Sequence, residues 1–251
     1  MDALIKSAAK NIDCANAKQL ARASFARLCF NARNQHHAVK PSGLPPAIAQ
    51  AIANLLPILL CGEESAELTF DQLAKQLPAS QKHTFEAQLM SIAYDERCHG
   101  QLLDALRQTL PAPRRRSSAR HAARFLRGLA SADLALHLVR IAAIDAGLCQ
   151  ILAEVCHRDR PITHWINIHT VFQRIRRDEG RHVRISRRCA KALGLAASVE
   201  RDERGLVLQN FAALLAPEAE SFAVLGVDFN ALLARFARLS HVLPTPLIAH
   251  A

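Results

Sequence analysis

The pattern Asp-Glu-x-x-His occurs twice in this chain of 251 residues, as Asp95-Glu96-Arg97-Cys98-His99 and as Asp178-Glu179-Gly180-Arg181-His182. On an α-helix, residues three apart lie on one face, about one turn apart, so the Glu and the His of each segment can reach a common point. A single Glu-x-x-His is more often a solvated pair on a helix surface. Two copies on separate long helices instead predict two helices that face each other, with these side chains between them.

The rest of the chain also has the composition of helices. Segments of alternating Val, Ile, Thr and aromatic residues are few, only nine residues are Gly, and good helix formers such as Ala, Leu, Arg and Gln dominate. The sequence therefore predicts an all-α fold. The expected helices are residues 4–32 as one helix or a pair, 47–77, 80–110 with Ser80 as N-cap, 119–156 with a bend near 128–131, 162–193 ending at Gly194, 199–215, 217–225 and 229–239.

Four of these helices are long, and short turns pair them into two hairpins. The Pro-containing basic segment 111–118 separates the hairpins and belongs in solvent. This arrangement predicts a four-helix bundle at residues 45–194. An N-terminal helical extension at residues 1–44 and C-terminal helices at residues 195–251, packed on the bundle, complete the expected organisation.

Each motif helix has an antiparallel partner just upstream, which can supply one more carboxylate at the same depth. Counting from Glu179 back to the turn and the same distance beyond it ends close to Asp145, in an apolar segment. An unpaired carboxylate in such a setting would be costly, since it would have to neutralise or find a cation. Asp145 is therefore a candidate ligand.

The same count from Glu96 ends beside Glu63 and Glu64. Glu63 is preferred because it continues the apolar stripe of its helix, and Glu64 and Glu67 remain alternatives. The interval from Glu63 to Glu96 is nearly as long as the interval from Asp145 to Glu179, as two equivalent hairpins require.

The predicted site contains four carboxylates and two imidazoles around two metal ions: Glu63, Glu96, His99, Asp145, Glu179 and His182. Hard oxygen ligands with one imidazole per metal suit iron or manganese better than zinc, and they leave positions open for dioxygen. Two iron ions are therefore the expected cofactor, with manganese possible in place of one or both.

These paired motifs resemble those of the ferritin-like di-iron oxygenases and oxidases, which include bacterial multicomponent monooxygenases, acyl-carrier-protein desaturases and p-aminobenzoate N-oxygenase-like enzymes. The resemblance covers roughly residues 45–193 and implies a ferritin-like four-helix bundle with additional N- and C-terminal helices. It also implies that Asp95 and Asp178 each hydrogen-bond the ligand His of the opposite motif, with Arg181 in the surrounding ion pairs.

The function implied by the resemblance is a dioxygen-dependent oxidoreductase of specialised metabolism. It would hydroxylate, desaturate or N-oxidise a small or carrier-protein-tethered substrate, with an external electron donor. Three positions depart from the family pattern. Asp145 stands where Glu is usual, Ile175 replaces the third His of the N-oxygenases, and Leu103 replaces the radical Tyr of ribonucleotide reductase small subunits.

The chain is strongly basic, with 32 Lys and Arg against 22 Asp and Glu, a net charge of +10 and a pI near 9.8. Such a surface attracts acidic partners, and the Arg-rich runs are read as solvated helix faces or as a dock for an acidic protein. An aromatic content of 5% disfavours nucleic acid. Seven scattered cysteines and no signal-like start indicate the cytoplasm. The apolar run 48–61 is judged too short and too polar for a membrane span, and a homodimer is possible through the C-terminal helices.

Two other functions remain open from the sequence, a ferritin-like ferroxidase that handles iron and an RNA-modifying di-iron hydroxylase. A non-catalytic, helical nucleic-acid-binding protein is a weaker reading of the charge. His137, two turns before Asp145, could line the cavity, but a position at the surface or next to the ligands is favoured. Cys149, one turn after Asp145, is expected to face the same interior, where it could shape the dioxygen pocket or act as a small buried side chain.

Overall fold

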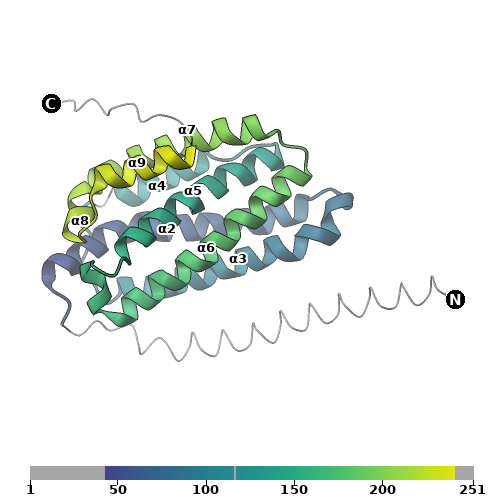
Figure 1. Cartoon of the computed structure of the whole chain (residues 1–251). Helices are drawn as coiled ribbons and strands as arrows, with labels where there is room; N and C mark the ends of the chain where they lie inside the picture. The colour runs from purple at the N-terminus through teal and green to yellow at the C-terminus, as the bar shows by residue number, and fades with distance from the viewer. Residues whose placement is uncertain (1–42, 116, 241–251) are drawn as a thin grey trace. The chain divides into compact units, whose positions relative to one another are not determined.

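The structure, a computed structural model, describes residues 43–115 and 117–240, and these residues form helices and connecting turns without a β-strand (Figure 1). The all-α prediction is confirmed. The predicted helix at 4–32 and the tail after residue 240 lie outside the described residues. The long helices are α2 (Pro46–Gln76), α3 (Ala79–Arg107), α5 (Leu134–Val155) and α6 (Ile166–Ala192). The shorter elements are α4 (Ser118–Arg127), the 3₁₀ helices η1 (Pro161–His164) and η2 (Ala216–Glu218), α7 (Ala197–Leu215), α8 (Ala219–Val224) and α9 (Phe229–Ser240).

The four long helices pack in a ring, in which α2 contacts α3, α3 contacts α6, α6 contacts α5, and α5 contacts α2. Among the shorter helices, α7 and α9 pack on α5, while α4 and α8 pack on α2. Helix α4 also contacts α7. These two helices therefore cover the seam between α2 and α5 from outside the ring.

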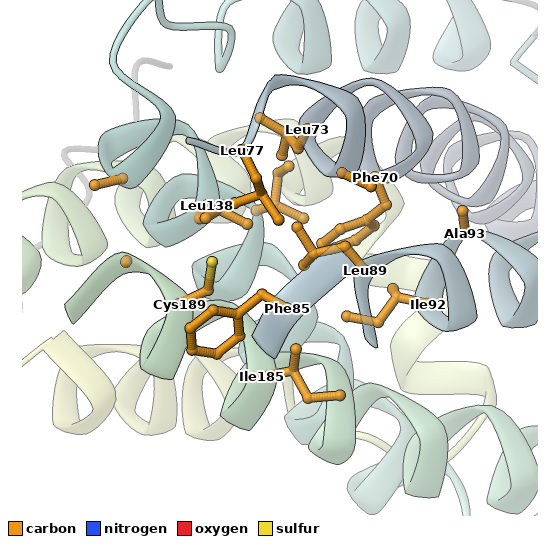
Figure 2. Packing of buried hydrophobic residues seen from close by; sticks show 14 of the residues in the cluster. Phe70, Leu73, Leu77, Phe85, Leu89, Ile92, Ala93, Leu138, Ile185 and Cys189 are labelled. Atoms are coloured by element: carbon orange, nitrogen blue, oxygen red, sulfur yellow. The ribbon is translucent and has the colours of Figure 1, made fainter. Parts of the chain in front are cut away.

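Buried apolar side chains gather at one end of the four long helices (Figure 2). Phe70 and Leu73 come from the second half of α2, Leu89 from the first half of α3, Leu138 from the start of α5, and Cys189 from the end of α6. Each such side chain contributes about 1.5–3 kcal/mol when it is fully buried. Since the end of α2 meets the start of α5, and the start of α3 meets the end of α6, neighbouring helices in the ring are antiparallel.

The helix expected at residues 119–156 is broken rather than bent. Helix α4 ends at Arg127, and α5 begins at Leu134. Asp133 is the N-cap of α5, since its Oδ1 accepts hydrogen bonds from the backbone N–H groups of Ala135 at 2.8 Å and Leu136 at 3.2 Å. A capping carboxylate satisfies donors that a helix start leaves unpaired, so it favours a new helix over a continuous one.

The sequence predicts the C-terminal end of α6 correctly but not the N-cap of α3. Ser80 is not the N-cap of α3, because the helix starts at Ala79 directly after the extended residue Pro78. Gly194 follows the end of α6 with φ of +93°. There the N–H of Leu195 donates to the carbonyl oxygen of Ala190 and the N–H of Gly194 to that of Lys191, a pair of bonds that requires a left-handed residue.

Helix α2 is longer than the apolar run that the sequence analysis judged too short for a membrane span. It continues past Pro57 to Gln76, and by length and mean hydropathy, which is 1.4 over its most apolar window, it could cross a membrane. In the described fold 56% of that window is buried inside the protein. The core helix of a soluble protein has the same properties, so this finding is weak evidence for a membrane span.

Candidate metal centre

All six predicted ligand side chains lie in the interior between the four long helices. Helices α2 and α5 supply one carboxylate each, and α3 and α6 supply a Glu and a His each. None of the six is more than 5% exposed: Glu63, Glu96, His99, Asp145, Glu179 and His182. Four carboxylates buried together repel one another and lose their hydration, so their charge must be neutralised by protons or by cations.

The ligand atoms form two overlapping groups that could each hold a metal ion. One group contains Glu63, Glu96, His99 and Glu179, and the other contains Asp145, Glu179 and His182, with the ligand atoms of each group within 4.8 Å of one another. Glu179 belongs to both groups. Glu96 also reaches the second group, since its Oε1 lies 2.8 Å from Nδ1 of His182. These two glutamates are therefore placed to bridge two ions.

Both histidines turn Nδ1 toward the carboxylates. Nδ1 of His99 lies 3.2 Å from Oε2 of Glu63 and 3.5 Å from Oε1 of Glu179. Nδ1 of His182 lies 3.5 Å from Oε2 of Glu179, besides its approach to Glu96. The two Nδ1 atoms are thus the imidazole nitrogens whose lone pairs are available to a metal.

The opposite ring nitrogens meet the aspartates of the facing motif. Nε2 of His99 lies 3.2 Å from Oδ2 of Asp178, and Nε2 of His182 lies 3.2 Å from Oδ2 of Asp95. When Nε2 carries the proton and donates to the aspartate, Nδ1 is left as an unprotonated ligand, and the ring orientation is held. Arg181 forms an ion pair with Asp95.

The carboxyl groups of the centre differ in their pKa values. Burial raises the pKa of Glu63 well above its usual value. Burial also raises the pKa of Asp145, and the negative charge of Glu179 acts in the same direction. Burial would raise the pKa of Glu96 as well, but its close approach to the two histidines, first to His182, outweighs burial and lowers that pKa.

The pKa values of both imidazoles are raised. Burial alone would lower their pKa values, but interactions with the carboxylates prevail. The pKa of His182 rises to about 10 through Glu179 and Glu96, and the pKa of His99 rises well above its usual value, chiefly through Glu63. In the protein alone, protons on the imidazoles and on some carboxyl groups therefore supply the positive charge that cations would otherwise bring.

The hydrogen bonds inside the centre are incomplete. Five buried atoms lack a hydrogen-bond partner: Glu63 Oε1, Glu96 Oε1, Asp145 Oδ2, Glu179 Oε1 and His182 Nδ1. His182 Nδ1 and Glu96 Oε1 are close, but the angles do not suit a hydrogen bond. Since buried polar atoms in proteins are nearly always partnered, five orphaned donor and acceptor atoms in one cluster fit a metal site. Carboxylate oxygen and imidazole nitrogen are ligands that iron and manganese accept.

No protein-family model, curated protein or solved structure matches this chain. Its chemistry must be inferred from the site itself.

The alternative first ligands lie away from the centre. Glu64 is exposed to solvent, and Oε1 of Glu67 accepts a hydrogen bond of 2.7 Å from Nε of Arg97 at the surface. Only Glu63, among the three, points between the helices. The apolar stripe of α2 was therefore the useful signal for choosing among the three acidic residues.

A cavity of about 60 Å³ opens onto the carboxylates of the centre. Four of the predicted ligands line it, namely Glu63, Glu96, Asp145 and Glu179. The remaining wall is mostly apolar and comes from α2, α4, α5 and α7, with His137, Ser65 and Thr69 among the few polar side chains. The two ligand histidines are not part of the wall, so the cavity reaches the centre from the α2 and α5 side.

The structure also places His137 and Cys149, for each of which the sequence left two positions open. His137 lies in the cavity wall, which was the less favoured of its two positions. Cys149 does not line this cavity, and its Sγ instead contacts the backbone oxygen of Arg176 on α6 at 3.6 Å. Sequence reasoning did not single out Ser65 and Thr69, although both follow Glu63 along α2, because Ser and Thr on a helix carry no signal of their own.

Proposed function

We propose that this chain is a ferritin-like, non-haem di-iron oxidoreductase that uses dioxygen to hydroxylate, desaturate or N-oxidise a small or carrier-tethered substrate. The observation that carries the proposal is the pair of overlapping ligand groups sharing Glu179, buried between four antiparallel helices. This ligand set is the one used by di-iron and di-manganese helical bundles, with a Glu-x-x-His on two helices and a carboxylate on each of the others.

The side chains of the chain have three roles in this proposal. Glu96 and Glu179 would hold two cations close together, since each reaches both groups. Asp95 and Asp178 orient the imidazoles through Nε2. The apolar wall around the centre limits the access of water to it. Two bound ferrous ions would supply the electrons that reduce dioxygen.

The adjoining cavity favours an oxidoreductase over a ferroxidase that only handles iron. A ferroxidase needs a path for ions, which polar and charged side chains serve best, whereas this wall is built largely from Ile, Leu and Phe. Sizing by light scattering separates the two functions further. A small oligomer is expected of the oxidoreductase, and a cage of many subunits would favour iron storage.

The outer face of α4 is the proposed dock for an acidic partner, such as a carrier protein or an electron donor. Arg120, Arg124 and Arg127 are exposed there. The inner face of the same helix contributes Phe125 and Leu126 to the cavity wall. A partner bound to these arginines would therefore sit beside the cavity, held by charge complementarity.

The test of the proposal is anaerobic titration with ferrous iron, metal analysis, and then measurement of oxygen uptake. We expect about two iron ions per chain, as in other centres with this ligand set. Glu96→Ala and Glu179→Ala should lose iron binding and oxygen uptake. Glu64→Ala, which changes an exposed glutamate next to Glu63, should retain both. Uptake of fewer than about one iron per chain, or full activity in the two ligand variants, would overturn the proposal.

A further inference from the structure

A second cavity, of about 380 Å³, lies outside the ring of long helices, where α7 and α9 pack on α5 (Figure 1). Its wall comes from α5, α6, α7 and α9, and none of its described residues also lines the cavity beside the metal centre. Ala146 and Val183 line it, whereas the preceding residues, Asp145 and His182, belong to the metal centre. The second cavity is therefore a separate site, on the opposite side of α5 and α6 from the candidate ligands.

The wall of this cavity has an apolar part and a charged part. The apolar part is a floor of small side chains from α5 and α6, with Leu239 of α9 beside it: Val139, Ala142, Ala143, Ala146 and Val183. The charged part contains Arg187 of α6, Glu200 and Arg204 of α7, and Arg238 of α9. Among the described residues of the wall, three arginines thus accompany one glutamate. The excess of positive charge favours an anion and disfavours a cation.

One carboxylate oxygen serves two of the arginines. Oε1 of Glu200 accepts hydrogen bonds from Nε of Arg187 and, at 3.2 Å, from Nη1 of Arg204. The side chain of Arg204 is only 14% exposed, and its buried Nε has no hydrogen-bond partner in the described parts of the chain. Burial lowers the pKa of Arg204, and the positive charge of Arg187 acts in the same direction. Since buried charges and buried N–H groups normally have partners, the guanidinium of Arg204 lacks compensation that a bound anion would supply.

Two simpler classes of ligand would use only part of this wall. Inorganic phosphate would pair with the arginines but would leave the apolar floor uncovered. An uncharged apolar molecule would cover the floor but would leave the excess positive charge uncompensated. The volume of about 380 Å³ is in the range of small-molecule sites. A ligand with an anionic end and an apolar chain is therefore complementary to both parts of the wall.

We propose that the second cavity binds a fatty acid of medium chain length, with its carboxylate on Arg187, Arg204 and Arg238 and its alkyl chain on the floor of Ala and Val side chains. The planar guanidinium groups match a carboxylate in shape and charge. The bound chain lies against the outer faces of α5 and α6. This site goes beyond the proposed oxidoreductase, since it needs neither iron nor dioxygen.

Isothermal titration calorimetry of the full, iron-free chain with octanoate tests the proposal. Octanoate should bind with a Kd below about 1 mM. Shortening the probe to butanoate should weaken binding about two- to fourfold for each methylene removed, as expected for a buried alkyl chain. 1-Octanol, which carries no charge, should bind at least about tenfold more weakly than octanoate. These three probes examine both parts of the wall in the unchanged chain, so their result does not depend on whether a variant folds.

Two variants locate the carboxylate. Arg204→Gln should weaken octanoate at least about tenfold, because a hydrogen bond to a charged group is lost, and should leave 1-octanol unchanged. Arg238→Gln, which changes an exposed residue, should weaken octanoate about threefold. The matched control is Arg201→Gln, since Arg201 is exposed on α7, three residues before Arg204, and does not line the cavity. This control should bind octanoate as tightly as the unchanged chain does.

The inference is overturned if octanoate does not bind below about 1 mM, if butanoate or 1-octanol binds as tightly, or if Arg204→Gln weakens octanoate no more than Arg201→Gln does. The cavity beside the metal centre does not compete for the probe, because four carboxyl groups and no described Lys or Arg line it. Since no iron takes part, failure of this inference is distinguishable from failure of the iron titration that tests the proposed function.

Discussion

Gly147 on α5 is the position where one added methyl group tests the packing of α7 on the four long helices. A Cβ atom at this position would lie 3.0 Å from Cδ1 and 3.1 Å from Cε1 of Phe211, and 3.2 Å from Cδ2 of Leu208. Carbon atoms in ordinary contact are about 3.5–4.0 Å apart. Gly147→Ala therefore requires α7 or the Phe211 ring to move by at least a few tenths of an ångström.

The Phe211 ring has little freedom to move. It is 4% exposed and stacks between Phe125, at a centroid distance of 6.0 Å, and Phe236, at 5.9 Å. Overpacking a core costs about 1–3 kcal/mol, while Gly to Ala inside a helix gains about 0.5–1 kcal/mol. Gly147→Ala should therefore lower the free energy of unfolding by about 0.5–2 kcal/mol. For a chain of this size, that is a Tm lower by about 1–8 °C.

Thermal unfolding followed by circular dichroism, with a chelator present, measures this change. The control is Gly180→Ala on α6, where the nearest atom to the added Cβ is Nη1 of Arg184 at 3.9 Å. Without a clash, only the gain in helix propensity remains, so Gly180→Ala should raise the Tm by about 1–4 °C. If both variants raise the Tm equally, α7 does not pack on Gly147 as described.

Three further predictions concern the metal centre and the helix that carries Asp145. Asp178→Asn should weaken ferrous binding about 10–100-fold, because the His99 imidazole loses its charged partner. Asp104→Asn, which changes a half-exposed aspartate of α3, should not weaken it, and equal affinities of the two variants in an anaerobic titration would contradict this role of Asp178. Ferrous or manganous ions at about 100 times their Kd should stabilise the chain by about 2.7 kcal/mol, which thermal unfolding measures as a raised Tm. Glu179→Ala should abolish this rise. If the metal ions do not raise the Tm of the unchanged chain, the chain has no metal site of this kind. Asp133→Ala removes the N-cap of α5 and should lower the free energy of unfolding, measured in urea, by about 1 kcal/mol. Asp159→Ala, which changes an exposed aspartate, should leave it unchanged. If the two variants are equally stable, Asp133 does not cap α5.

The ligand positions were accessible from the sequence because helices rise uniformly. Glu63 and Asp145 were found by counting equal lengths of helix on either side of a turn, and such a count needs only the approximate position of the turn. The error of a few residues that the count leaves is resolved by chemistry. An acidic residue on an apolar stripe has few explanations other than a partner inside the core, which singled out Glu63 from Glu64 and Glu67.

The shape of the cavity could not be predicted from the sequence by such a count. It depends on how each helix is rotated about its own axis and on which additional helix covers the seam between α2 and α5. Side chains such as Ser65 and Thr69 are compatible with a surface or an interior position, so their place is decided by tertiary packing rather than by local pattern. A hydroxyl on a helix can donate to the backbone oxygen four residues earlier, as Thr69 does to Ser65, so it has a hydrogen-bond partner in either position.

The break between α4 and α5 determines which side chains of α4 line the cavity. A continuous helix over residues 119–156 would extend α4 along the axis of α5, away from the seam that it covers. The Asp133 cap starts a separate helix four residues before His137, and this leaves α4 free to pack on α2 and α7. Phe125 then closes the cavity from outside, while His137 faces it from the first turn of α5. The candidate ligands come from regular helices, whereas the outer wall of the cavity depends on one capped break between them.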